Sequence, residues 1–214
     1  MPNWVYTSVS ISGPAEIIAR FKDRASATAT ITTSDGQEHT VDGAISFWNF
    51  KAPPIHKYDE YYGMNGWKDG QHLGQTEWNW YEWNCKYWGT KWDASSAELT
   101  DEDSTNLSYR FDTAWAPAEG AFKAMVKPFP ELEFEFYCEE EQGWGVIYTG
   151  SKGKLKIKEQ WEIPSTHAEC EKREQTCVCE WDSDDPNNWF DDCPDKAEEV
   201  AKLAKENNEG ENNE

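Results

Sequence analysis

The stretch "ELEFEFYC", Glu131–Cys138, alternates acidic and apolar side chains and ends on a cysteine. Successive side chains of a β-strand point to opposite faces of the sheet. Leu132, Phe134, Phe136 and Cys138 would therefore share one face, while the glutamates lie mostly on the other. Such clean alternation is typical of an antiparallel sheet with one buried and one solvated face. The stretch therefore predicts a one-sided sheet with an aromatic core.

Two other segments alternate in the same way and predict further strands of this sheet. One face of "WVYTSVSIS", Trp4–Ser12, carries Val5, Thr7, Val9 and Ile11. One face of "LSYRFDTAW" carries Tyr109, Phe111, Thr113 and Trp115. In addition, "AISFWNF" before Pro53-Pro54 predicts a core strand, and "VIYTGSKGKLKIKEQWEI" predicts two antiparallel strands after the turn at Gly143 and Gly145.

Three segments have helical spacing. Pro14 suits the first position of a helix, where its missing N–H costs nothing, and Ile17, Ile18 and Phe21 follow as an apolar stripe. "TEWNWYEWNCKYW" places Trp80, Trp83, Tyr87 and Trp88 on one helical face, and Gly89 ends this helix. "PAEGAFKAMVKPFP" predicts a short third helix.

The segments between these elements are polar. Asp35-Gly36 marks a hairpin turn, residues 56–75 are expected to form a long loop, and "TKWDAS" is expected to be extended.

This order of elements predicts an α+β fold: a ferredoxin-like antiparallel sheet with helices packed on one face, plus a small cysteine-rich acidic C-terminal segment. We expect one domain over residues 1–163, with Phe111, Phe134, Phe136 and Trp83 buried. Residues 164–205 would form an acidic, cysteine-rich appendage with a short helix, and residues 206–214 a disordered tail.

Five motifs occur in order along the chain: "MPNW", "ISGP", "WGTKWDA", "FDTAWAP" and "FPELEFEFYCEEEQGWG". Together they resemble the YubB-type ferredoxin-like domain proteins of bacteriophages and conjugative plasmids, over roughly residues 1–160. Two positions depart from the family pattern: Val5 stands where a cysteine is usual, and Tyr87 where asparagine is common. The resemblance implies a mobile-element protein in a bacterial host cytoplasm, and it brings no catalytic residues.

The charge is strongly negative. The chain has 41 acidic and 20 basic residues, a net charge of -21, and residues 166–214 alone hold 16 acidic and 5 basic side chains. Such a field repels a nucleic-acid backbone and favours a partner protein with a basic surface, although acidity also serves solubility alone. The expected partner-binding residues are Asp182, Asp184, Asp185, Asp191 and Asp192. No signal segment and no apolar run of roughly 18 residues is present, so no membrane is expected.

The C-terminal segment holds four of the six cysteines, namely Cys170, Cys177, Cys179 and Cys193. Thiolates are good ligands for a tetrahedral zinc ion, and a metal would help to order a segment with few aliphatic residues. These four cysteines are the expected ligands of one structural zinc, with His167 in reserve. The spacing matches no standard zinc motif, so free thiols or disulfides remain the alternatives.

No HExxH, Walker-type, G-x-G-x-x-G or G-x-S-x-G element is present, so we do not expect an enzyme. The leading hypothesis is a non-enzymatic protein that binds and inhibits a host factor, with an antiviral defence complex as one candidate target. The alternative is a small-molecule binder that sequesters a nucleotide signal, with a base between Trp88 and Trp92 and a phosphate on Lys91. Structural packing is the simpler explanation for these tryptophans.

Overall fold

The computed structural model describes residues 2–63, 67–68, 71–72 and 77–163. The chain divides into two compact units, one of residues 1–141 and 145–160 and one of residues 142–144 and 161–214. In the second unit, the indole Nε1–H of Trp161 donates to the carbonyl of Gly143 at 2.9 Å. Both predicted C-terminal segments, residues 164–205 and 206–214, lie outside the described residues, together with all of their predicted zinc and partner sites.

The main sheet contains six strands in the order β10-β9-β8-β1-β7-β6. β1 pairs antiparallel with both β7 and β8, and β8 pairs antiparallel with β9. The strands are β1 (Trp4–Ser12), β6 (Ser95–Glu102), β7 (Asn106–Ala114), β8 (Glu133–Glu140), β9 (Gly145–Ser151) and β10 (Lys154–Trp161).

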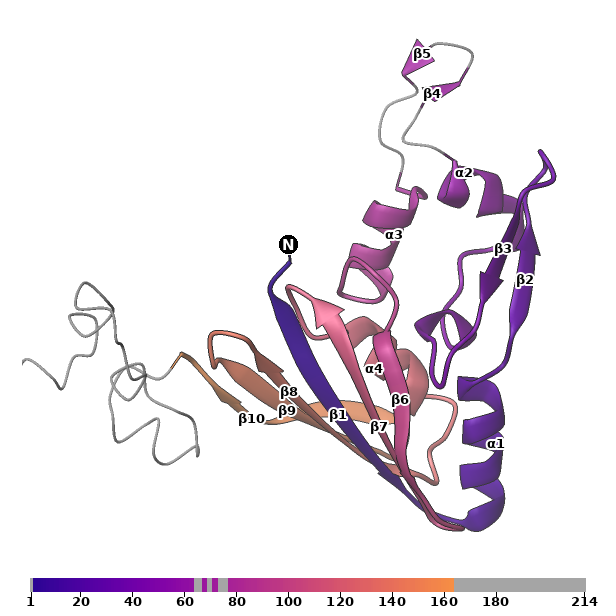
Figure 1. The fold of residues 1–214 in the computed structure, drawn as a ribbon. Helices are drawn as coiled ribbons and strands as arrows, with labels where there is room; N and C mark the ends of the chain where they lie inside the picture. Colours follow the sequence, from indigo (N-terminus) through magenta and orange to yellow (C-terminus); the bar gives the residue numbers. More distant parts are fainter. Residues whose placement is uncertain (1, 64–66, 69–70, 73–76, 164–214) are drawn as a thin grey trace, which may run out of the picture. The chain divides into compact units, whose positions relative to one another are not determined.

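The sequence order β1-α1-β6-β7-α4-β8 gives the ferredoxin-like arrangement, and β9 and β10 extend the sheet beyond β8. The helices α1 (Ala15–Ala25) and α4 (Glu119–Val126) lie on one face of this sheet (Figure 1). The predicted fold class, an antiparallel α+β sheet with its helices on one face, is confirmed.

The core between sheet and helices is largely aromatic. Phe21 of α1 stacks on Phe50 at 5.3 Å between ring centroids and meets Phe134 edge-on at 5.6 Å. Phe122 of α4 stacks on Phe136 at 4.3 Å. Large aromatic rings compensate for the shortage of aliphatic side chains because each removes much apolar surface from water. All four residues predicted to be buried are buried: Phe111, Phe134, Phe136 and Trp83.

A long insertion separates α1 from β6. It contains the hairpin β2 (Ala29–Thr32) and β3 (Glu38–Val41), the 3-10 helices η1 (Phe47–Asn49) and η2 (Ile55–Lys57), the helix α2 (Tyr58–Tyr62), the short strands β4 (Trp67–Lys68) and β5 (Gln71–His72), and the helix α3 (Trp80–Tyr87). The hairpin at Asp35-Gly36 and the helix before Gly89 are as predicted. Gly89 has φ 88°, a left-handed conformation that glycine adopts without strain.

Two predictions for the insertion were wrong. "AISFWNF" is not a core strand, because the chain turns into η1 after Ser46, whose hydroxyl accepts from the N–H of Trp48. Residues 56–75 are not one loop, because they include most of η2, all of α2 and the β4–β5 strand pair. Aromatic contacts stabilise α2: Tyr61 packs edge-on against Trp48 at 5.3 Å and Trp83 at 6.0 Å.

Two predictions near the sheet edge also need correction. "TKWDAS" was expected to be extended, but the strand β6 begins only at Ser95, after a series of bends. Trp115 was grouped with the inward face of β7. However, the chain turns at this residue with φ 62°, and its side chain is 47% exposed.

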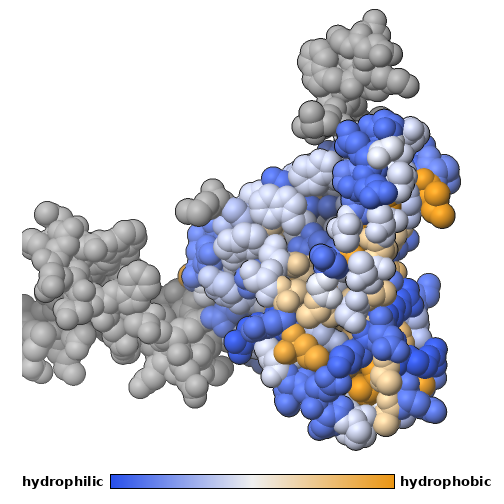
Figure 2. Space-filling model, turned by 45° about the vertical axis from the view of Figure 1, so that its right-hand side comes forward, coloured by the Kyte–Doolittle hydropathy of each residue, from blue (hydrophilic) through white to orange (hydrophobic). Residues whose placement is uncertain are grey.

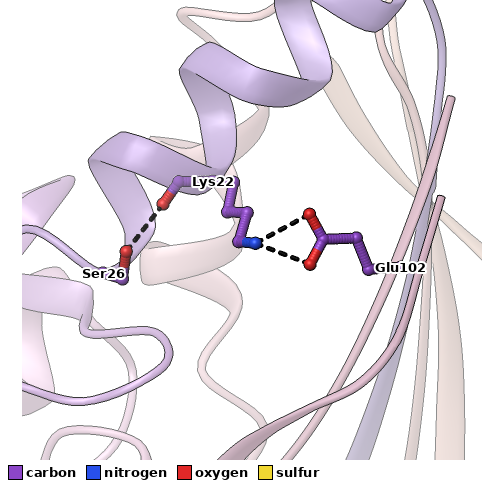
Figure 3. Close-up of polar contacts among 3 residues, drawn as sticks. All are labelled: Lys22, Ser26 and Glu102. Carbon is purple, nitrogen blue, oxygen red and sulfur yellow. Dashed lines mark hydrogen bonds and ion pairs between the residues drawn. The ribbon is translucent and has the colours of Figure 1, made fainter. Parts of the chain in front are cut away.

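The edge strand β6 is tied to α1 by an ion pair. The ammonium of Lys22 lies 2.5 and 2.7 Å from the two carboxylate oxygens of Glu102 (Figure 3). Both side chains are more than a third exposed, so solvent screens the pair and its contribution to stability is small. The contact shows that Glu102 points to the helix side of the sheet.

Candidate functional site

The motif "WGTKWDA", Trp88–Ala94, connects α3 to the start of β6, and two of its side chains hold the fold together. The Trp88 ring is 2% exposed, and its Nε1–H donates to the carbonyl of Lys51 at 2.8 Å. The hydroxyl of Thr90 donates to the carbonyl of Ala114 at 2.9 Å and accepts from the N–H of the same residue at 3.1 Å. These contacts fix the C-terminal end of the insertion on Lys51 and on the end of β7.

Asp93 organises the turn into η1. Its carboxylate accepts from the hydroxyl of Ser46 at 2.5 Å, from the N–H of Phe47 at 2.6 Å and from the N–H of Ala94 at 2.8 Å. Desolvation by burial raises the pKa of Asp93, and these hydrogen bonds oppose the shift. The residue therefore acts as a cap for a helical turn that lies 46 residues earlier in the sequence.

Between these anchors, the ammonium of Lys91 is surrounded by aromatic rings. Its Nζ lies 4.6 Å from the ring centroid of Trp92, 5.0 Å from that of Trp115, and 5.8 Å from those of Trp80 and Tyr81. Ring faces carry partial negative charge and attract a cation within about 6 Å. We call these four rings the Lys91 cage. They come from α3, the motif and the end of β7.

The cage lies partly at the surface. Trp115 is 47% exposed and Tyr81 is 41% exposed, whereas Trp92 is half-buried. Trp92 stacks on Trp115 with centroids 6.0 Å apart and also contacts Trp4 at 5.9 Å. The backbone φ of Trp115 is 62°, in the left-handed region. This conformation is costly for a bulky residue, and residues that adopt it cluster at functional sites.

A second feature is the sheet face opposite α1 and α4, which we call the open face. The strand register places Tyr6, Ser8 and Ser10 of β1 on this face, with Trp4 at its edge next to the cage. Carboxylates dominate the neighbouring strands. Those on the open face are Glu98, Asp101, Asp112, Glu133, Glu135 and Glu139.

Four basic side chains of the described strands accompany these six carboxylates, namely Arg110 and three residues that share one face of β10, Lys154, Lys156 and Lys158. Arg110 lies directly opposite Glu98, and the Lys158 ammonium lies 2.6 Å from the Glu135 carboxylate. Desolvation, together with the nearby carboxylates of Glu141 and Asp112, raises the pKa of Tyr6. The open face therefore has an excess of negative charge.

The hydrophobic patches that can be seen on one side of the described residues are small (Figure 2). On the side of the molecule that Figure 2 shows, hydrophilic residues surround small, separate hydrophobic patches. An interface on such a surface depends on charge and on the aromatic side chains more than on aliphatic area.

The structure brings together two of the three residues predicted for a ligand site. Lys91 and Trp92 are adjacent in the cage, but Trp88 packs in the core against Phe47 and Trp83. A base cannot stack between Trp88 and Trp92 in this arrangement, so the predicted sandwich is corrected. Sequence reasoning missed Trp80, Tyr81 and Trp115 as partners of Lys91. The available signal was a lysine that follows a tryptophan-rich helix.

Among the described residues, no group of three or more His, Cys, Asp or Glu side chains could hold a metal ion. The predicted zinc ligands Cys170, Cys177, Cys179 and Cys193 and the aspartates from Asp182 to Asp192 lie outside this part of the chain. In the same part, no helix has the length and apolarity needed to cross a bilayer.

The comparison with protein families supports a ferredoxin-like domain. No match was found among the curated proteins with which the sequence was compared. The chain is similar to the crystal structure of a protein api92 from Yersinia pseudotuberculosis, with 8% sequence identity, a TM-score of 0.49, and coverage of 77% of this chain and 99% of that chain. A family described as "Ferredoxin-like domain in Api92-like protein" matches residues 87–180. This part of the chain is thus similar to the ferredoxin-like domain of Api92-like proteins.

Proposed function

We propose that this protein is a non-enzymatic interaction protein that binds a host protein through an acidic surface and inhibits it. The observation that supports the proposal is the composition of the open face, where six carboxylates outnumber four basic side chains. Complementary charge steers a basic partner to this face and repels like-charged surfaces, a nucleic-acid backbone included.

The aromatic cluster supplies the second requirement of a protein interface. Charge alone gives orientation and speed of association, whereas tryptophan and tyrosine side chains contribute much of the binding energy at interfaces. Trp4 and Tyr6 connect the open face to the Lys91 cage through the contact between Trp4 and Trp92. A partner that covers the open face would reach these rings as well.

The resemblance to YubB-type proteins supports the finer part of the proposal. It favours a phage or plasmid origin, a bacterial host cytoplasm as the place of action, and a host factor such as an antiviral defence complex as the target. The acidic segment around Asp182, Asp184, Asp185, Asp191 and Asp192 is proposed as a second contact region. The four cysteines of that segment are proposed to bind one structural zinc.

Affinity capture from a bacterial host lysate tests the proposal. The bait is the full chain, compared with a variant that removes three open-face charges, Glu98→Gln, Asp101→Asn and Glu133→Gln. A matched control removes three exposed charges elsewhere, with Glu16→Gln, Asp23→Asn and Asp42→Asn. A basic protein that the wild type and the control retain, and that the open-face variant loses, is the expected result. Equal retention by all three baits would refute a role for the open face.

The alternative, a nucleotide-sequestering protein, is supported by the position of Lys91 between two partly exposed tryptophans. The ammonium, however, is directed at ring faces, and the adjoining open face is negative, so this site favours cations over phosphates. Titration with a panel of cyclic and linear nucleotides, followed by tryptophan fluorescence, separates the two functions. Submicromolar binding of one nucleotide would make nucleotide sequestration the better supported of the two functions.

A further inference from the structure

We propose that the Lys91 cage is a socket for a lysine side chain of the basic partner, and that the ammonium of Lys91 occupies this socket in the free protein. The inference rests on the proposed function, because it names the chemistry by which the partner is anchored next to the open face. It assigns to Trp80, Tyr81, Trp92 and Trp115 the role of recognising an alkylammonium group.

The geometry is that of a cation-binding cage. Four rings lie within 5.8 Å of one ammonium nitrogen, and Trp92 and Trp115 are the nearest at 4.6 and 5.0 Å. Groups of aromatic rings in this arrangement bind alkylated ammonium ligands in other proteins, because each ring face contributes an electrostatic attraction without a strongly hydrated counter-charge. Because all four rings attract positive charge, the cage favours cations over neutral and negatively charged ligands.

Access to the cage comes from its outer rings. Trp115 and Tyr81 are both exposed, and the other two rings of the cage, Trp80 and Trp92, are only partly buried. The left-handed backbone at Trp115 directs a tryptophan away from the core that its neighbours Thr113 and Ala114 join. Backbone conformations of this kind are costly and cluster at ligand-binding and active sites.

Lys91 is the internal occupant. Its own backbone is held at both sides, by Thr90 on Ala114 and by Asp93 on Phe47, so only its side chain is free to leave the cage. A tethered ammonium competes with an incoming one at a high effective concentration. The apparent affinity for an incoming ammonium is then the intrinsic affinity multiplied by the fraction of time for which the cage is empty.

The test uses the full chain and the simplest probe, tetramethylammonium chloride, with sodium chloride matched for ionic strength. Binding is followed by the NMR signals of the indole N–H groups of Trp92 and Trp115, each assigned with a single Trp→Phe variant. In Lys91→Ala, we expect saturable shifts of both signals and an affinity about tenfold higher than in wild type, because the internal competitor is gone. A neutral probe of the same shape, neopentyl alcohol, should not bind.

Lys91→Met keeps the length of the side chain without its charge, and it replaces Lys91→Ala if circular dichroism shows that the alanine variant is unfolded. Lys86→Ala is the matched control: Lys86 lies 5.3 Å from the Tyr87 ring, outside the cage, and its removal should leave the affinity at the wild-type value. In wild type, the ε-methylene protons of Lys91 should also show a larger upfield ring-current shift than those of Lys86, because Lys91 lies near four rings and Lys86 near Tyr87.

Three results would overturn the inference: no binding to folded Lys91 variants, equal affinity in wild type and Lys91→Ala, or equal binding of the neutral probe. Because this titration contains no partner protein, its failure refutes the socket and leaves the open-face proposal standing. The lysate capture with open-face variants, none of which changes a cage residue, can fail without affecting the result of the titration.

Discussion

Asp93→Ala should destabilise the protein by about 3 kcal/mol, because it removes the acceptor of three hydrogen bonds at once. The hydroxyl of Ser46 and the N–H groups of Phe47 and Ala94 would each lose this partner, and an unsatisfied buried group costs about 1–3 kcal/mol. The substitution also removes the cost of burying the Asp93 charge, which offsets part of this loss. We therefore count about 1 kcal/mol, the lower end of the range, for each of the three groups.

Asp93→Asn is the informative companion. The amide oxygen can still accept from both N–H groups, and the amide N–H can donate to the Ser46 oxygen, so we expect a cost of about 1 kcal/mol or less. Asp101→Ala, an exposed position on β6, is the control and should stay within about 0.5 kcal/mol of wild type.

Urea unfolding at pH 7, monitored by tryptophan fluorescence and by circular dichroism, gives the three free energies of unfolding at a common slope. The pKa of Asp93 is raised in the native state, so the native protein binds more protons than the unfolded chain between the two pKa values. Wild type should therefore lose stability as pH rises from about 4, the unfolded value, to the raised native value, whereas Asp93→Asn should not. The reasoning is wrong if Asp93→Ala matches the control, or if the asparagine variant is as unstable as the alanine variant.

Three shorter predictions address the core, the thiols and the C-terminal segment. Phe134→Ala should cost about 3–5 kcal/mol in urea unfolding, because the residue is 3% exposed, whereas the exposed Ile157→Ala should cost little. Similar costs for both would contradict the burial of Phe134. Alkylation of the native protein should label Cys85 before Cys138, because Cys138 is buried and burial raises its pKa to about 12. Peptide mass spectrometry measures the two rates, and the reverse order would contradict the burial of Cys138. Protein purified without chelator should contain about one equivalent of zinc for one tetrahedral site, and reduced protein with only trace metal would refute the zinc proposal.

The sheet could be predicted from the sequence where one face of a strand is buried. β1, β7 and β8 alternate strictly because the helices cover only one side of them, and Phe134 and Phe136 report this directly. The glutamates of β8 follow the prediction except Glu140, which is buried near the strand end. The alternation of apolar and polar residues was sufficient to predict these strands, because successive side chains of a strand point to opposite faces and only one face is buried.

η1, β6 and the cage could not be predicted in this way. "AISFWNF" contains enough apolar residues for a strand, but Asp93 accepts from Ser46 and Phe47, 47 and 46 residues away, and selects a helical turn. β6 is an edge strand with few buried residues, so it lacks an apolar alternation. The Lys91 cage combines rings from three elements, and only the tertiary fold shows that Trp88 points inward while Trp115 points outward.

The most direct test of the central claim is the dissociation constant of the captured partner, measured at two salt concentrations. Against wild type, the triple open-face variant Glu98→Gln, Asp101→Asn and Glu133→Gln should bind about tenfold or more weakly at low salt, and the difference should shrink as salt screens the charges. The triple control at Glu16, Asp23 and Asp42 should bind as wild type does. Equal dissociation constants for the two triple variants at low salt would contradict the claim that the open face recognises a basic partner.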